Sequence, residues 1–239
     1  MSDDDDGISV SRRRLFRGLA VAPVSVAALY GAAAAVEPTE SAQGATHRYT
    51  PTFFNSPEWQ FLLAACDRLI PPDQTGPGAL EAGVPEFIDR HMQTPYASGD
   101  LWYMQGPYLE APPELGYQGR LALRDLLRVG FKAVDAHCQQ TAAGKTFAQL
   151  SHAEQEAVLR QLEAGKVALE QVPAKELFSQ LLNEVRAGYF CDPRHGGNRN
   201  MAAWKMIGYP GMRADYLDWV EVRDRSYPLP PVDLSGKRG

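Results

Sequence analysis

Hydrophobic side chains recur every three or four residues in five stretches of the chain, which is the spacing of amphipathic α-helices. The stretches cover residues 56–70, 84–93, 117–140, 151–163 and 174–189. In the first, Ser56 has the position of an N-cap and Pro57 that of the first helical residue, while Pro71 ends the pattern. The sequence offers no run of four to eight residues that alternates β-branched with polar side chains. The pattern therefore predicts an all-α fold.

Long connections separate these stretches, and one of them is rich in aromatic side chains. Residues 95–116 combine several Pro and Gly residues, which favour a loop, with Tyr96, Trp102, Tyr103 and Tyr108. Aromatic side chains in a loop pack either on their own domain or against a partner, where they are enriched. The sequence leaves both alternatives open. We expect a small single domain of about five to seven helices with long irregular loops.

The N-terminus has the layout of an export signal. Paired arginines follow a serine and precede two large apolar residues, in the order Ser11, Arg12, Arg13, Leu15 and Phe16. A mildly apolar run at 18–35 comes next, and this arrangement is typical of a twin-arginine (Tat) signal, which directs proteins that have already folded. The sequence therefore predicts a signal peptide at 1–35, a linker at 36–56 and a helical domain at 57–239.

An uncleaved membrane anchor is the alternative interpretation of residues 18–35. The run is shorter than the roughly 20 strongly apolar residues of a membrane span, and it contains Pro23 and Gly31. It also lacks a cationic flank on its far side. The signal-peptide interpretation predicts a periplasmic protein that is exported by the Tat pathway.

Charge and cysteine content narrow the function classes. Residues 1–35 contain four Asp and four Arg, so the net charge of −5 carried by the whole chain is also that of residues 36–239. This balance argues against nucleic-acid binding, which needs a basic face. Three cysteines, Cys66, Cys138 and Cys191, match no zinc or haem spacing. Cys66 fits buried packing in a helix, and Cys191, which precedes a turn, is expected to be the most accessible.

The most unusual segment is GYFCDPRHGGNRNMAAWKMIGYPG at residues 188–211. Asp192-Pro193 begins a turn, and the Gly-Gly-Asn that follows can adopt left-handed backbone conformations. Residues 201–207 predict a short helix, in which Trp204 and Ile207 face the same way, toward the core. The segment therefore predicts a rigid, folded turn cluster.

Catalytic chemistry in this cluster is the less favoured interpretation. Cys191, Asp192 and His195 suggest a nucleophile, an acid and a base. Neighbours in sequence are poorly placed for such a triad, so a turn histidine that packs or hydrogen-bonds locally is favoured. The other helical histidines lack metal-ligand spacing and are interpreted as surface or helix-end residues: His91, His137 and His152. The Gly-Gly-Asn also lacks the strand and the lysine of a phosphate loop.

The turn segment resembles the hallmark of the gluconate 2-dehydrogenase subunit 3 family, the small subunits of membrane-associated flavin dehydrogenases. The family pattern is roughly G-x-F-x-D-P-x-Y-G-G-N, followed by W-x-x-I-G-Y-P-G. The matching residues are Phe190, Asp192, Pro193, Gly196, Gly197, Asn198, Trp204, Ile207, Gly208, Tyr209, Pro210 and Gly211. His195 departs from the pattern, because the family usually has Tyr there. Residues 67–71, 82–89 and 147–151 resemble upstream segments of the family.

The resemblance implies a role in a complex and no reaction of this chain's own. Members pair with a large FAD-dependent dehydrogenase subunit of the GMC type, which oxidises a sugar, a sugar acid or a polyol. A multihaem cytochrome c subunit often accepts the electrons. The small subunit binds no flavin; it acts as folding partner and export escort of the FAD subunit, through the Tat translocase, and the complex associates with the inner membrane. An independent exported enzyme or binding protein is the alternative.

Under this interpretation two groups of residues are candidates for contact with the large subunit. They are Tyr96, Trp102, Tyr103 and Tyr108 in the loop, and Tyr189, Cys191, Asp192, His195, Gly196, Gly197, Asn198 and Tyr209 in the turn segment. Residues 189–211 have the alternative of capping the chain's own core. Cys191 is also a candidate for a disulfide to the large subunit, with a free thiol or an internal bond to Cys138 as the alternatives.

Overall fold

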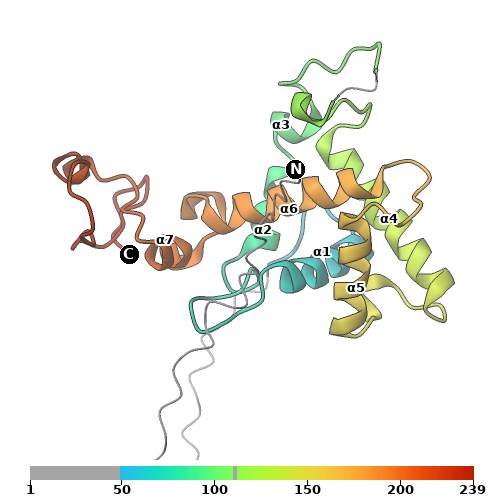
Figure 1. Cartoon of the computed structure of the whole chain (residues 1–239), viewed down its shortest axis with the longest axis horizontal. Coiled ribbons are helices and arrows are strands. Elements are labelled where there is room, and N and C mark those ends of the chain that lie inside the picture. The colour runs from blue at the N-terminus through green and yellow to red at the C-terminus, as the bar shows by residue number, and fades with distance from the viewer. Residues whose placement is uncertain (1–48, 110–111) are drawn as a thin grey trace, which may run out of the picture. The chain divides into compact units, whose positions relative to one another are not determined.

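The computed structural model describes residues 49–109 and 112–239, so the predicted signal peptide lies outside the described part. Within that part the chain forms seven α-helices and five short 3-10 helices, with two isolated β-bridges and no strand (Figure 1). The α-helices are α1 Ser56–Leu69, α2 Val84–His91, α3 Pro95–Ser98, α4 Leu123–Thr141, α5 His152–Glu163, α6 Ala174–Phe190 and α7 Ala202–Ile207. The 3-10 helices are η2 Pro113–Leu115, η3 Phe147–Gln149, η4 Pro193–His195, η5 Arg199–Met201 and η6 Ala214–Trp219. The predicted small all-α domain with long irregular loops is confirmed.

The first helix begins one residue earlier than its sequence pattern predicts. Its N-cap is Asn55, whose side chain accepts a hydrogen bond from Glu58 N at 3.0 Å, while the Glu58 carboxylate accepts one from Asn55 N at 3.0 Å. A cap at Ser56 would place Trp59 where this reciprocal pair needs an acidic side chain. The capping box therefore starts the helix at Ser56, one residue earlier than predicted, so Pro57 lies inside the first turn.

The third predicted stretch is helical only from Leu123, and residues 117–122 stay outside the helix. The Tyr117 hydroxyl accepts a hydrogen bond from Leu121 N at 3.3 Å, which folds this segment on itself. The ring lies so close to Gly119 that a Cβ there would come within 2.1 Å of the hydroxyl oxygen. The apolar spacing alone continues the helical pattern through residues 117–122. The hydrogen bond between Leu121 N and the Tyr117 hydroxyl instead holds these residues in a non-helical conformation.

The helix α6 is the central element, because it contacts α1, α2, α4 and α5 and leads into α7 (Figure 1). The core between the other helices is aromatic. Phe61 of α1 stacks on Phe131 of α4, with ring centroids 4.3 Å apart, and lies 4.6 Å from the ring of Phe147. All three side chains are buried. Burial of such rings supplies much of the free energy that fixes the helices relative to one another.

Close packing of α4 on α6 depends on Gly130. A Cβ at this position would lie 2.3 Å from Leu177 Cδ1, and Leu177 is itself buried. The gap between the two helices is therefore already filled by the leucine. The glycine thus marks a close approach of the two helices.

Gly130→Ala is expected to lower the free energy of unfolding by about 1 kcal/mol, because the clash with Leu177 outweighs the better helix propensity of Ala. Thermal and urea denaturation followed by circular dichroism would measure it. In a Leu177→Ala background the clash is gone, and the same change should stabilise the chain by about 1 kcal/mol. Equal destabilisation in both backgrounds would show that this contact is not the cause.

The segment just before α1, which the sequence assigns to the end of a linker, is held to α2 by the carboxylate of Asp89. The hydroxyls of Tyr49 and Thr52 donate to it at 2.8 and 3.1 Å. The backbone N–H groups of Thr52, Phe53 and Phe54 donate at 2.8, 3.1 and 2.9 Å. Asp89 is completely buried. Burial raises the pKa of Asp89, but the hydrogen bonds lower it more, so the net pKa lies below its ordinary value.

Candidate partner interface

The turn cluster at residues 188–211 fastens α7 to the end of α6. Asn198 is buried and uses its amide twice: it donates to Cys191 O at 2.9 Å and accepts from Ala203 N at 3.0 Å. The indole of Trp204 donates to Phe190 O at 2.8 Å, and this side chain is only 5% exposed. These three bonds satisfy backbone groups that the ends of α6 and α7 would otherwise leave unpaired. The cluster is folded and internally hydrogen-bonded, as expected of a turn cluster; its rigidity stays a prediction.

The adjacent glycines Gly196 and Gly197 serve different purposes. Gly196 has φ 102° and Asn198 φ 43°, so both adopt the left-handed conformation expected of them. Gly197 does not, and its role is steric: a Cβ there would lie 2.1 Å from Gly188 O and 2.9 Å from Cys191 Sγ. The backbone of residue 197 thus lies directly against the last turn of α6.

The structure does not assemble Cys191, Asp192 and His195 into a triad. The Asp192 carboxylate accepts hydrogen bonds from Arg194 N at 3.0 Å and from Leu234 N at 2.8 Å. The Cys191 thiol donates to Gly188 O at 3.3 Å, and His195 is exposed. Within the described residues no hydrogen bond joins any two of the three side chains. Their contacts support the backbone of the turn.

All three cysteines are free thiols, and Cys191 is the most accessible of them, as predicted. Burial raises the pKa of Cys191 to about 11. Since the thiolate is the species that exchanges with disulfides, this thiol is poorly reactive at neutral pH in the isolated chain. A disulfide from Cys191 to a partner subunit stays a prediction.

The structure divides the candidate contact residues into surface and interior. Tyr209 is 43% exposed, and Tyr103 is 82% exposed. Tyr96 and Trp102 are about equally exposed, at 40% and 39%. The remaining exposed or half-buried candidates are Tyr108, Cys191, Asp192, His195 and Gly196. Tyr189, Gly197 and Asn198 are buried, so for these three the structure favours the alternative of capping the chain's own core.

Ile207 is exposed, so the prediction that it lies in the core beside Trp204 is wrong. The Ile207 side chain is 55% exposed, and its neighbour Met206 is 39% exposed. The reason is that α7 is only six residues long and ends here, and the chain reverses at Gly208 with φ 70°. Only the Trp204 side of the helix meets α6. Ile207 therefore joins Tyr209 as exposed apolar surface.

The aromatic loop predicted at residues 95–116, of which 95–109 and 112–116 are described, is partly folded on the domain and partly exposed. The Tyr96 ring stacks on His91 with centroids 5.2 Å apart, and Trp102 meets Tyr96 edge-on at 5.1 Å. His91 is a helix-end histidine, as the sequence suggests, because it is the last residue of α2, and its Nδ1 lies 2.7 Å from Oε2 of the buried Glu184. Tyr96 and Trp102 therefore follow the alternative of packing on the chain's own domain, and contact of the exposed part of the loop with a partner stays a prediction.

The exposed half of the loop contains aliphatic side chains that the sequence analysis missed. They are Leu101, Leu109 and Leu115, with exposed fractions of 72%, 70% and 66%. Since the loop has no periodicity, the sequence gives no signal of which apolar residues face solvent. Tyr103 is exposed in the same loop, and exposed apolar side chains that gather in one segment are candidates for protein–protein contact.

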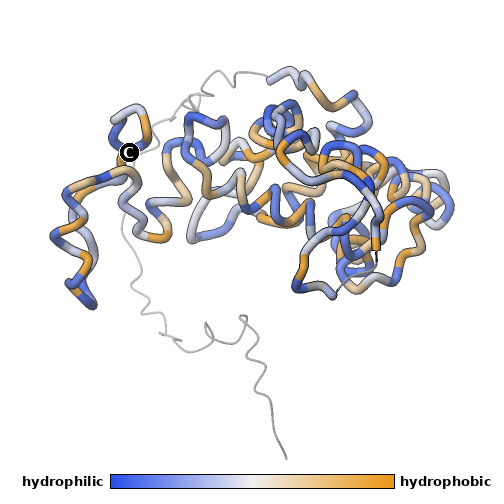
Figure 2. Tube along the Cα trace, turned by 90° about the horizontal axis from the view of Figure 1, so that it is seen from above, coloured by the Kyte–Doolittle hydropathy of each residue, from blue (hydrophilic) through white to orange (hydrophobic). Residues whose placement is uncertain are grey.

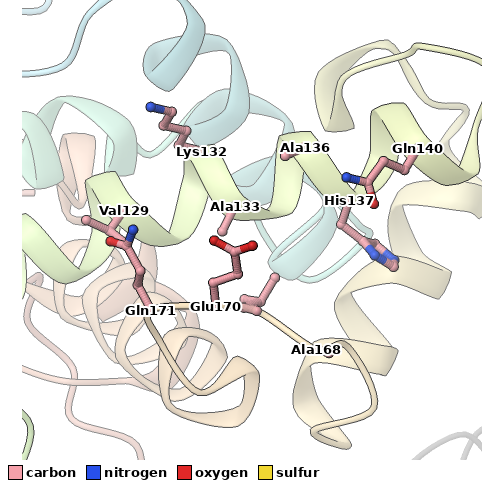
Figure 3. A pocket seen from close by; sticks show the side chains of 10 residues that line it. Val129, Lys132, Ala133, Ala136, His137, Gln140, Ala168, Glu170 and Gln171 are labelled. Atoms are coloured by element: carbon pink, nitrogen blue, oxygen red, sulfur yellow. The ribbon is translucent and has the colours of Figure 1, made fainter.

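One hollow in the helical domain brings ionisable side chains from two segments together. A hollow of about 450 Å³ lies between α4 and residues 168–171, and Figure 3 shows Lys132, His137 and Glu170 at its walls. No hydrogen bond joins these three side chains in the described structure. Residues 49–109 and 112–239 also contain no group of three or more His, Cys, Asp or Glu side chains placed to hold a metal ion. None of their helices has the length and hydropathy of a membrane span.

Comparison with protein families gave one match, which covers most of the described helices. The family model described as gluconate 2-dehydrogenase subunit 3 matches residues 56–211. The match begins at the first residue of α1 and ends at the last glycine of the turn cluster. Comparisons with curated proteins and with solved structures gave no match.

Proposed function

The chain belongs to the gluconate 2-dehydrogenase subunit 3 family, and from this premise we propose that it is the non-catalytic small subunit of a periplasmic flavin-dependent dehydrogenase complex. The complex oxidises a sugar, a sugar acid or a polyol. The small subunit is the folding partner of the large FAD subunit and escorts it through the Tat translocase. FAD belongs to the large GMC-type subunit, and haem c belongs to a cytochrome c subunit where one is present.

One observation supports this proposal more than any other. The family-matched region keeps large apolar side chains in water on segments that are firmly braced from inside. Tyr209 and Ile207 are exposed at the end of a cluster held by the buried amide of Asn198. A protein that only needed a stable core would gain by burying such side chains. A rigid apolar surface is what a permanent subunit contact requires.

The absence of sequence motifs for cofactors agrees with this division of labour. The sequence contains neither G-x-G-x-x-G nor C-x-x-C-H. In the proposal this chain therefore contributes a binding surface and the export signal, and the large subunit catalyses the reaction. The export signal is the twin-arginine segment at Ser11 to Phe16.

The escort role is tested by co-expressing this chain with the large flavoprotein subunit of the proposed complex. Arg12→Lys combined with Arg13→Lys is expected to leave the large subunit and its dye-linked dehydrogenase activity in the cytoplasm, because the pair carries the export signal. Activity is measured in separated periplasmic and cytoplasmic fractions.

The matched control is Arg14→Ala, which removes a neighbouring cation and keeps the Arg12-Arg13 pair. This variant should export the large subunit as the wild type does. Periplasmic activity that is undiminished in the double variant would contradict the escort role. Failure of the two wild-type chains to co-purify would contradict the proposed complex itself.

A further inference from the structure

The last part of the chain forms a separate arm that begins where the family match ends. We define the C-terminal arm as residues 212–231. Its base is closed by backbone hydrogen bonds, Met212 N to Val232 O at 2.7 Å and Val232 N to Pro210 O at 3.1 Å. The chain thus leaves the turn cluster at Gly211 and returns to it at Val232. Asp192 also accepts from Leu234 N, which ties the returning segment to the same cluster.

The arm is braced from within by Arg213. Its guanidinium donates to the carboxylate of Asp215 at 3.0 Å, to the Tyr227 hydroxyl at 2.9 Å and to Pro230 O at 3.0 Å. Tyr227 also packs edge-on against the rings of Tyr216 and Trp219, with centroids 5.2 and 5.6 Å away. One cation therefore connects the outgoing and returning halves of the arm.

The bracing holds apolar side chains in water. Leu217 is 76% exposed, Val220 60% and Met212 54%. Figure 2 shows hydrophobic positions alternating with hydrophilic ones along this segment. Among the exposed charged residues of the arm, Asp218, Glu221, Arg223 and Arg225 form no ion pair in the described structure. The arm thus presents exposed apolar side chains together with unpaired charges of both signs.

From these features we infer that the C-terminal arm is a docking element that inserts into the large dehydrogenase subunit of the same complex. The inference rests on the proposed function. The occupant follows from continuity along the chain: the arm begins directly after the exposed apolar residues Met206, Ile207 and Tyr209, which lie inside the family-matched region. A pre-braced arm loses little conformational freedom on binding, so its apolar contacts convert efficiently into affinity.

The chemistry of the partner surface follows from the arm. Leu217 and Val220 require an apolar depression on the large subunit, since a flat polar surface would leave both side chains partly exposed to solvent. The rim of that depression carries charges of both signs, which complement Asp218, Glu221, Arg223 and Arg225. Since the arm lies beyond the family match, this contact belongs to this chain and its own large subunit.

The test uses the two subunits co-expressed, with an affinity tag on this chain. Leu217→Ser combined with Val220→Ser is expected to weaken the affinity for the large subunit about 10- to 100-fold, because two central apolar contacts are lost. Leu80→Ser is the control, since Leu80 is exposed and lies outside the arm and the turn cluster. The tagged Leu80→Ser variant should co-purify with the same amount of large subunit as the wild type does.

A second variant separates docking from folding. Arg213→Ala keeps the apolar side chains and removes the brace, so proteolysis at 212–231 should quicken while the unfolding transition of the helical domain is unchanged. Its affinity for the large subunit should fall as well. Unchanged recovery with both variants overturns the inference and leaves the proposed function standing, whereas no recovery with the wild type contradicts the proposed function. A wild-type chain that is a dimer by itself, and monomeric with the serine variant, assigns the arm to a second copy and overturns the inference.

Discussion

Asp89→Ala is expected to lower the free energy of unfolding by about 4 kcal/mol, because it leaves a set of buried donors without their acceptor. Three of these donors are the backbone N–H groups of residues 52–54, which all point at this one carboxylate. Asp89 is completely buried, so water cannot replace the carboxylate without opening the structure. Urea denaturation followed by circular dichroism measures the loss.

The control for this prediction is Asp218→Ala, which removes an exposed carboxylate that forms no ion pair in the described structure. It should change the free energy of unfolding by less than about 0.5 kcal/mol. A comparable effect of the two substitutions would contradict the role assigned to Asp89.

The contribution of Asp89 also depends on pH in a definite direction. The pKa of this carboxyl is lowered in the folded chain, so its ionised form stabilises the fold. The stabilisation is complete above the unfolded pKa of about 3.9 and is lost as the pH falls through the folded pKa. The difference in stability between wild type and Asp89→Asn should therefore be constant near neutrality and shrink below about pH 4. A constant difference down to about pH 2, below the range in which carboxyl groups titrate, would show that ionisation of Asp89 is not involved.

Gly197→Ala is expected to cost about 3 kcal/mol, at the upper end of the usual overpacking penalty. The reason is that the new Cβ would lie 2.1 Å from Gly188 O, and a backbone carbonyl in the last turn of a buried helix cannot move aside as a side-chain end can. The turn cluster would have to shift away from α6, which would stretch the bond from Asn198 to Cys191 O. Thermal denaturation measures the loss.

Gly144→Ala is the matched control. Gly144 has φ 81°, and a Cβ added there would meet no atom within 4 Å, so only the conformational penalty of about 1 kcal/mol remains. Gly197 carries no such backbone penalty, so any larger loss there is steric. A smaller loss at Gly197 than at Gly144 would show that the close approach to α6 is easily relaxed.

Much of the fold could be predicted from the sequence because its helices are amphipathic and their ends carry capping residues. The stretch predicted at 151–163 is α5, and a capping box starts it, with Ser151 accepting from Glu154 N. Prediction was wrong where a side chain outside the periodic pattern determined the backbone, as Tyr117 does before α4. Periodicity counts apolar positions and carries no information on such local contacts.

The candidate surface was predicted less completely, for two physical reasons. A buried polar side chain such as Asp89 has no sequence signature, because its donors lie 35 to 40 residues away along the chain. Exposure in irregular segments is also invisible to a pattern, so Leu101 and Leu217 could not be distinguished from core residues. The turn cluster was predicted because its glycines and asparagine constrain the backbone directly.

The bonds to Asp89 also determine where a mechanical load would enter the domain. Tension applied to the chain ahead of residue 49 meets Tyr49 and Thr52 first, and their bonds pass it to Asp89. From Asp89 the tension passes into α2, which packs on the central helix α6. The tension reaches the N-cap of α1 at Asn55 only after these contacts. The domain would thus resist being pulled from its N-terminal side as one body, and α1 would be shielded from unravelling.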